Sequence, residues 1–307
     1  MLKRVSITVL LILFIAPAIV SAGGSDPKCT TKYPVVLAHG MGASAEILGI
    51  INYWGSIDGA LEDEGAEVYV TSVNGMDGTR NKAEDFKAQL LEILAVSGAD
   101  KVNIIGHSHG TIYTRDAISN LGLGSRVASH TSMAGPHKGS YIAVFVFDKL
   151  RGEIADLLGV EMALVENVVA GLIDFIYAFV FGDTDPDTAQ NGWDLHPDYM
   201  NNVFNPNTKN LDSIYYQSWA AKVKTFAPSI IMHPTWMIML SGEGPNDGLV
   251  GIESAKWGKF KGVVSGAWWS TGVDHLTIIG MPLDLTPGFD APEFYIDIVG
   301  DLKSQGF

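Results

Sequence analysis

Residues 102–116, VNIIGHSHGTIYTRD, join two segments of different periodicity through a turn that is rich in glycine and histidine. The apolar run at 101–106 predicts a buried strand, and residues 111–120 have the composition of a helix. Gly106 and Gly110, each two residues from Ser108, would let the strand and the helix approach each other closely. The stretch therefore predicts a strand, a sharp turn with Ser108 at its tip, and a helix.

Segments of the same two kinds lie on either side of this unit. Short apolar runs at 33–40, 67–71 and 126–135 alternate with segments of helical character at 52–64 and 79–95. Such alternation is typical of parallel strands that are joined by crossover helices. We therefore expect an α/β fold with a mostly parallel central sheet and helices on both faces.

The second half of the chain is less regular. Further strands are expected at 213–219 and 261–269, and a closing helix at 291–303. Residues 141–182 are strongly apolar but carry acidic residues at intervals, so they predict one or two amphipathic helices and no simple membrane span. The polar stretch 182–202 has the composition of a loop. We interpret residues of about 140–210 as an insertion over the sheet.

The N-terminus has the pattern of a secretory signal peptide. Lys3 and Arg4 precede an apolar run at 7–20, and Val20 and Ala22 suit the positions before a cleavage site. The run is short for a bilayer span, and an uncleaved membrane anchor is the alternative. We expect residues 1–22 to be removed, leaving a single domain at 23–307 that is secreted, either extracellular or periplasmic.

The composition limits the possible partners. The 307 residues are 47% hydrophobic and 18% charged, which is enough for a substantial core. Without the leader, 34 acidic residues face 18 basic ones, a net charge near −16 that argues against nucleic acid or an anionic membrane as main partner. Cys29 is the one cysteine, so no intramolecular disulfide can form. No later run predicts a stable transmembrane anchor.

The pentapeptide GHSHG matches G-x-S-x-G, with the strand before it and the helix after it that this motif requires. The sharp turn would strain the backbone of Ser108 and lift its hydroxyl to a helix N-terminus, where developing negative charge is favoured. These features predict a nucleophilic serine. A turn serine with only a structural role is the alternative.

A serine nucleophile needs a base and an orienting acid, which in the α/β-hydrolase fold follow it in the order serine, acid, histidine. His275 is the only histidine beyond residue 240, and Asp247 in GPNDGLVG precedes it. We predict that Ser108, Asp247 and His275 form a catalytic triad. His275 could instead be a simple loop residue, Asp247 a turn aspartate, and Asp274 a rival acid by its proximity.

Acyl transfer also needs N–H donors for the oxyanion. The backbone N–H of His109 is one candidate, and that of Met41, in the loop after the first strand, is the other. In this interpretation His39 shapes the loop. The side chains of His107 and His109 pack and fix loops.

Five motifs follow one another as in a known family: YPVVLAHGMG, KVNIIGHSHG, GPHKGS, NDGLVG and DHL. They resemble the secreted true lipases of the Pseudomonas and Burkholderia type, triacylglycerol lipases of the α/β-hydrolase superfamily. The resemblance is close over 33–140 and then patchy until 246–276. It implies the same triad and oxyanion hole, and a helical lid after Ser140 that covers the site in water and opens at a lipid surface.

The departures from that family bear on cofactors. The family holds a structural calcium with an aspartate and a glutamine just after the catalytic histidine, whereas this chain has Thr277 and Met281 there. Neither is a suitable ligand for a hard cation, and no upstream acidic ligand stands in KTFAPSIIMHPTW. We therefore expect no family-type calcium site, no metal and no other cofactor. The need for a dedicated folding chaperone stays open.

Together these features predict a secreted serine hydrolase that cleaves carboxylic esters, as a triacylglycerol lipase acting on a hydrophobic ester at a lipid–water interface. A short-chain carboxylesterase or a polyesterase is the alternative within the enzymes. A catalytically inactive, lipid-binding α/β-hydrolase homologue is the alternative from a different class.

Overall fold

The computed structural model describes residues 26–42, 46–47, 51–150, 187–281 and 286–307. The predicted signal peptide, residues 1–22, lies outside the described residues, and so does the greater part of the predicted lid, residues 151–186. The start of that insertion is helical, with α4 at Tyr141–Val144 and a π-helical turn, η2, at Phe145–Leu150.

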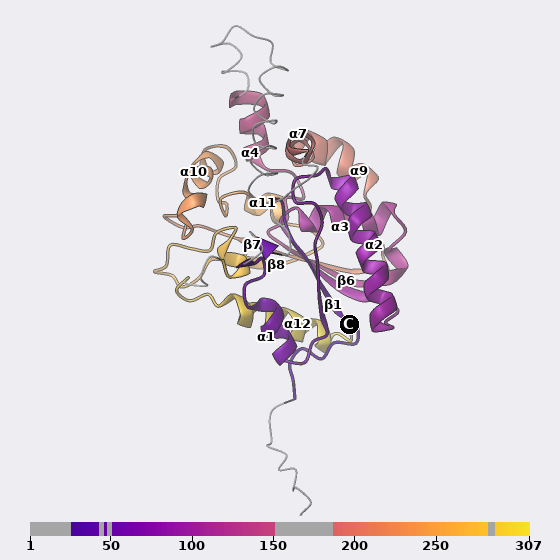
Figure 1. The fold of residues 1–307 in the computed structure, drawn as a ribbon. Helices are drawn as coiled ribbons and strands as arrows, with labels where there is room; N and C mark the ends of the chain where they lie inside the picture. Colours follow the sequence, from indigo (N-terminus) through magenta and orange to yellow (C-terminus); the bar gives the residue numbers. More distant parts are fainter. Residues whose placement is uncertain (1–25, 43–45, 48–50, 151–186, 282–285) are drawn as a thin grey trace, which may run out of the picture.

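A six-stranded sheet in the order β4-β1-β5-β6-β7-β8 forms the centre of the fold (Figure 1). Every neighbouring pair is parallel, which confirms the predicted α/β-hydrolase class of sheet. All residues of β1, β5 and β6 are buried, as expected for strands covered on both faces. The strands are β1 Val35–Ala38, β4 Val68–Thr71, β5 Val102–His107, β6 Val127–Met133, β7 Tyr215–Ala221 and β8 Lys259–Val264.

Helices cover both faces of this sheet (Figure 1). On one face α1, Ile57–Asp63, packs beside α12, Ala291–Ser304. On the other face α2, Thr79–Ser97, packs beside α3, Gly110–Asn120. Each pair buries an apolar cluster against the sheet, and these two clusters are the main cores.

The local sequence explains where several helices begin and end. The Asp290 side chain accepts a hydrogen bond from Glu293 N at the start of α12, while Gly98 ends α2 in the left-handed conformation. The remaining short elements are β2 Glu46–Ile47, β3 Ile51–Asn52, η1 Gly124–Arg126, α9 Asn205–Asn207, α11 Ile252–Ala255 and η5 Thr277–Ile279. None of the described helices has the length and apolar content needed to span a bilayer.

The prediction of a loop at residues 182–202 was wrong for residues 187–202, which the structure describes. That part forms α7 Thr188–Trp193, α8 Pro197–Tyr199 and a π-helical turn, η3, at Met200–Phe204. Leu195, Met200 and Phe204 are buried against Ile112 of α3, so a few apolar anchors among polar residues suffice to fix these short helices.

Two boundaries differ from the prediction, and one helix was not predicted. Helix α1 begins at Ile57 because Asn52 is paired in the β2–β3 hairpin. Strand β8 ends at Val264, before a turn at Gly266 that has a positive φ. An unpredicted helix, α10 at His233–Gly242, follows the 3-10 turn η4 at Ile230–Met232; its apolar residues lack a clear period, and Pro234 suits its first turn.

Candidate active site

Ser108 lies at the turn between β5 and α3 with a φ of 55°, in the left-handed region that a side chain normally avoids. Gly106 and Gly110 have to be glycines, because neighbouring backbone atoms leave no room for a side chain at either position. A Cβ on Gly110 would overlap carbonyl oxygens at the end of β1, and one on Gly106 would lie 2.9 Å from the backbone nitrogen of Thr111. The strand and helix therefore approach as predicted, and they hold the serine in a strained conformation at the end of the sheet.

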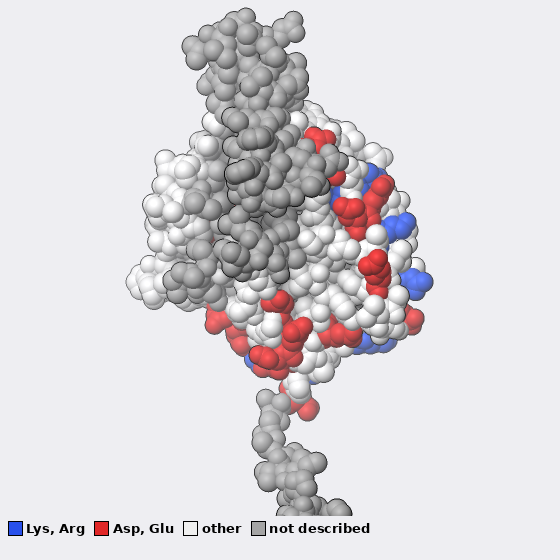
Figure 2. Space-filling model, in the orientation of Figure 1, with Lys and Arg blue, Asp and Glu red and all other residues white. Residues whose placement is uncertain are grey.

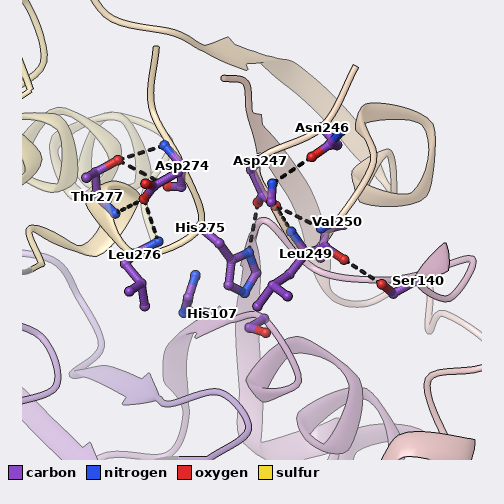
Figure 3. A network of polar contacts seen from close by, with 12 residues as sticks. His107, Ser140, Asn246, Asp247, Leu249, Val250, Asp274, His275, Leu276 and Thr277 are labelled. Atoms are coloured by element: carbon purple, nitrogen blue, oxygen red, sulfur yellow. Dashed lines mark hydrogen bonds and ion pairs between the residues drawn. The ribbon is translucent and has the colours of Figure 1, made fainter. Parts of the chain in front are cut away.

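Asp247 and His275 form a buried pair beyond the ends of β7 and β8. His275 Nδ1 lies 2.8 Å from Asp247 Oδ2, and the backbone N–H of His275 donates to the Asp247 carbonyl, also over 2.8 Å (Figure 3). Asp247 Oδ1 accepts from the amides of Leu249 and Val250. Because the carboxylate only accepts, it fixes the proton of the ring on Nδ1 and leaves Nε2 as the acceptor.

The geometry distinguishes Asp247 from the rival Asp274. The carboxylate of Asp274 accepts hydrogen bonds from the amides of Leu276 and Thr277 (Figure 3). It also accepts from the backbone N–H and the hydroxyl of Ser229. These bonds fix the loop that carries His275. Asp274 is therefore occupied as a loop anchor, and Asp247 is the acid that contacts the histidine ring.

Ser108 and His275 come to the same edge of the sheet. The ring of His107, the residue before Ser108, lies against the His275 ring with centroids 4.6 Å apart. Among the described residues His275 Nε2 is buried and has no hydrogen-bond partner. The bond from Ser108 Oγ to Nε2 is therefore not made in this conformation, and such bonds often tighten only when substrate is bound.

Tyr53, which the sequence did not single out, links the two sides of the site. Its hydroxyl accepts a hydrogen bond from Gly40 N over 2.9 Å and donates to His107 Nδ1 over 2.6 Å. Burial, and next the neighbouring His275, lower the pKa of His107 well below 6.5, so this ring stays neutral. Tyr53 begins the stretch YWGSIDGAL, which resembles the lipase family but belongs to no catalytic motif, so the sequence alone indicated no role for its hydroxyl.

The amides at the end of β1 differ in their availability. Gly40 N donates to Tyr53, and Gly42 N donates to the Gly75 carbonyl over 3.0 Å. Within the described parts of the chain, the N–H groups of Met41 and His109 donate to no other group. The two amides predicted for the oxyanion hole are thus both available to donate a hydrogen bond to a substrate.

The side chains of His39 and His109 serve to hold loops together. His39 Nδ1 donates to the Gly40 carbonyl and Nε2 accepts from Val73 N, while burial lowers its pKa to about 4. His109 Nδ1 lies 3.1 Å from Lys82 Nζ, and Nε2 lies 2.7 Å from Thr79 Oγ1. Neither imidazole is placed as a base for Ser108.

The two positions compared with calcium ligands have other contacts here. Thr277 Oγ1 accepts from Asp274 N over 2.7 Å, and Met281 packs against the main apolar core. No group of three or more histidine, cysteine or acidic side chains in the described residues is arranged to hold a metal ion. The lack of a family-type calcium site stays a prediction.

A parallel sheet with a strained serine at a strand–helix turn, followed by an aspartate–histidine pair on later loops, defines an α/β-hydrolase. The palmitoyl protein thioesterase family pattern matches residues 34–174. A triacylglycerol lipase of Vibrio cholerae is 32% identical over 247 residues, covering 75% of each chain. The chain belongs to this triacylglycerol lipase family, as the resemblance predicted.

Other similar proteins agree with this assignment. The triacylglycerol lipase of Burkholderia plantarii is 35% identical over 161 residues, 52% of this chain and 44% of that protein. The chain spans about half the length of this relative and of one from Pseudarthrobacter phenanthrenivorans. The mature lipase BlEst2 of Bacillus licheniformis shares the fold, with a TM-score of 0.62 at 18% identity over 89% of this chain and 93% of that one.

Proposed function

We propose that this protein hydrolyses carboxylic esters of hydrophobic acyl chains as a serine lipase, with Ser108, His275 and Asp247 as its triad. The observation that carries the proposal is the buried Asp247–His275 pair. It presents an unpartnered Nε2 at the sheet edge where the strained Ser108 lies. Membership of the triacylglycerol lipase family supports a lipid ester as the substrate.

The mechanism follows from these positions. His275 Nε2 takes the proton of Ser108 Oγ, which attacks the ester carbonyl and forms a tetrahedral oxyanion. The free amides of Met41 and His109 donate hydrogen bonds to that oxyanion. The protonated His275 then gives its proton to the leaving alcohol, and water, activated by the same ring, releases the acid from the acyl-enzyme. Asp247 holds the ring and stabilises its charged form.

The test is hydrolysis of 4-nitrophenyl esters from acetate to palmitate, with and without a chelator. Ser108→Ala is expected to abolish turnover. Ser304→Ala, on the exposed end of α12, is the matched control and should behave as wild type. Activity that persists in Ser108→Ala would refute the mechanism, and inhibition by the chelator would show that a metal is needed.

The same series separates the alternatives. A maximum at long chains supports a lipase, whereas a maximum at short chains supports a carboxylesterase. No hydrolysis of any ester would favour an inactive lipid-binding homologue. We also propose that the protein is secreted after loss of residues 1–22, which N-terminal sequencing of the mature protein would test.

A further inference from the structure

Two adjacent tryptophans are strongly exposed next to the catalytic loops in the part of the chain that the structure describes. Trp268 is 90% exposed and Trp269 is 63% exposed, in the turn that follows β8. Neither ring makes a hydrogen bond or ring contact with another described residue. We call residues 265–270 the tryptophan loop.

The backbone of this loop is firmly held although its rings are free. The Ser270 hydroxyl donates to the Ala267 carbonyl over 2.7 Å, and Ala267 N donates to the Pro287 carbonyl over 3.0 Å. Lys224 Nζ donates to the carbonyls of Gly266 and Ala267. A rigid loop therefore presents both indoles to the outside, and little conformational entropy is lost when they bind.

Further exposed apolar residues lie on the segments that lead to the site. Lys224 N donates to the carbonyl of Thr271, the residue that follows the tryptophan loop, so this loop lies beside the segment before α10. That segment exposes Phe226 and Ile230, and α10 itself exposes Met237 and Leu240. The tryptophan loop precedes His275, and α10 precedes Asp247. The apolar surface therefore borders both catalytic loops.

The charge distribution indicates what this surface can bind. In Figures 1 and 2, which share one orientation, α10 and the yellow loops beside it lie on a face with almost no charged residues, whereas acidic side chains gather elsewhere. The chain carries a net charge of −14, so anionic lipids repel it. Indole rings favour the interface between lipid and water.

We propose that the tryptophan loop, together with Phe226 and Ile230, anchors the protein on an uncharged lipid surface, with the catalytic loops facing the lipid. The anchor lies outside residues 151–186, so it does not depend on the predicted lid. The inference deepens the proposed function, because it rests on a lipid ester as the substrate.

Sedimentation with sucrose-loaded phosphatidylcholine vesicles tests the proposal. The parent protein carries Ser108→Ala so that no hydrolysis occurs, and the test variant adds Trp268→Ser and Trp269→Ser. Burying one large aromatic side chain favours partitioning by about tenfold, so the double change should weaken vesicle binding by about tenfold or more. The parent, but not the double variant, should show a blue shift of its tryptophan fluorescence on vesicle addition.

The matched control adds Leu91→Ser and Val96→Ser instead, on α2 at the opposite side of the molecule (Figure 1). Both residues are exposed, Val96 by 79%, and the control should bind vesicles as the parent does. Equal binding by the double tryptophan variant, or equal loss in the control, would overturn the proposal. Binding that requires phosphatidylserine would also overturn it.

Two further measurements distinguish lipid anchoring from self-association and from catalysis. If size-exclusion chromatography shows that the tryptophan changes dissociate a dimer while vesicle binding persists, the surface binds a second copy and the proposal is wrong. Hydrolysis of a soluble ester by the unmodified protein tests the proposed function independently. Vesicle binding without any hydrolysis would leave the anchor supported and the proposed function refuted.

Discussion

Replacing Tyr53 by phenylalanine removes one hydroxyl and leaves the ring in place. That hydroxyl connects Gly40 N, in the loop before Met41, with His107 Nδ1 beside the His275 ring. Both partners are buried, and in the variant each loses the bond that the hydroxyl supplied. We expect a less stable protein whose oxyanion loop and histidine are less well held.

The magnitude follows from the two lost bonds. Each buried polar group that is left unsatisfied costs about 1 to 3 kcal/mol, so the loss of two bonds should lower the free energy of unfolding by about 2 to 6 kcal/mol. For a chain of this size that corresponds to a decrease in melting temperature of about 4 to 10 °C. We also expect kcat for a soluble ester to fall by about tenfold with little change in KM, since the binding surface is untouched.

Tyr295→Phe provides the matched control for this experiment. Tyr295 is fully buried in the same core, but among the described residues its hydroxyl has no hydrogen-bond partner. Removing that hydroxyl should leave stability unchanged or raise it by up to about 1 kcal/mol. Urea unfolding of both variants measures the difference. Equal losses in the two would refute the reasoning, because the two hydrogen bonds of the Tyr53 hydroxyl would then not account for the effect.

Three more expectations concern the acid, the turn and pH. Asp247→Asn should keep the fold but lower kcat by about 10³-fold or more, since it no longer fixes the tautomer of His275; an unaffected kcat would exclude Asp247 as the acid. Gly110→Ala should prevent stable folding, because its Cβ meets backbone atoms, whereas Gly59→Ala in α1 meets nothing within 4 Å and should add about 0.5 to 1 kcal/mol in urea unfolding. Burial lowers the pKa of His39 to about 4, so between pH 6.5 and 4 the unfolded chain binds a proton that the folded chain does not. The free energy of unfolding should therefore decrease as the pH is lowered, with a loss of about 2 kcal/mol from this histidine between pH 7 and pH 5. Equal unfolding free energies at the two pH values would contradict the shift.

The sequence was sufficient where one local pattern determines the structure. The strand, turn and helix around Ser108 follow from spacing and glycine alone, and Asp247 and His275 were found from the order serine, acid, histidine that the α/β-hydrolase fold requires. Tyr53 was missed because its role depends on two partners distant in sequence. The helices after Asp187 were missed because tertiary burial of a few residues outweighs a polar composition.

One edge of the sheet sets the geometry of the whole candidate site. Parallel strands end on the same side, so the loop with Met41 after β1 and the turn with Ser108 after β5 are neighbours by topology. Their separation is then fixed by contact, because Gly110 approaches the end of β1 so closely that no side chain fits between them. The acid and the histidine arrive from loops beyond β7 and β8 and are tied to each other through both backbone and side chain. Described parts of the insertion after β6 are tied into this arrangement: the Ser140 hydroxyl donates to the Leu249 carbonyl on the loop that carries Asp247, and the Asn191 side chain accepts from Lys82, which contacts His109. Changes at these two positions are therefore expected to disturb the groups that would perform the chemistry.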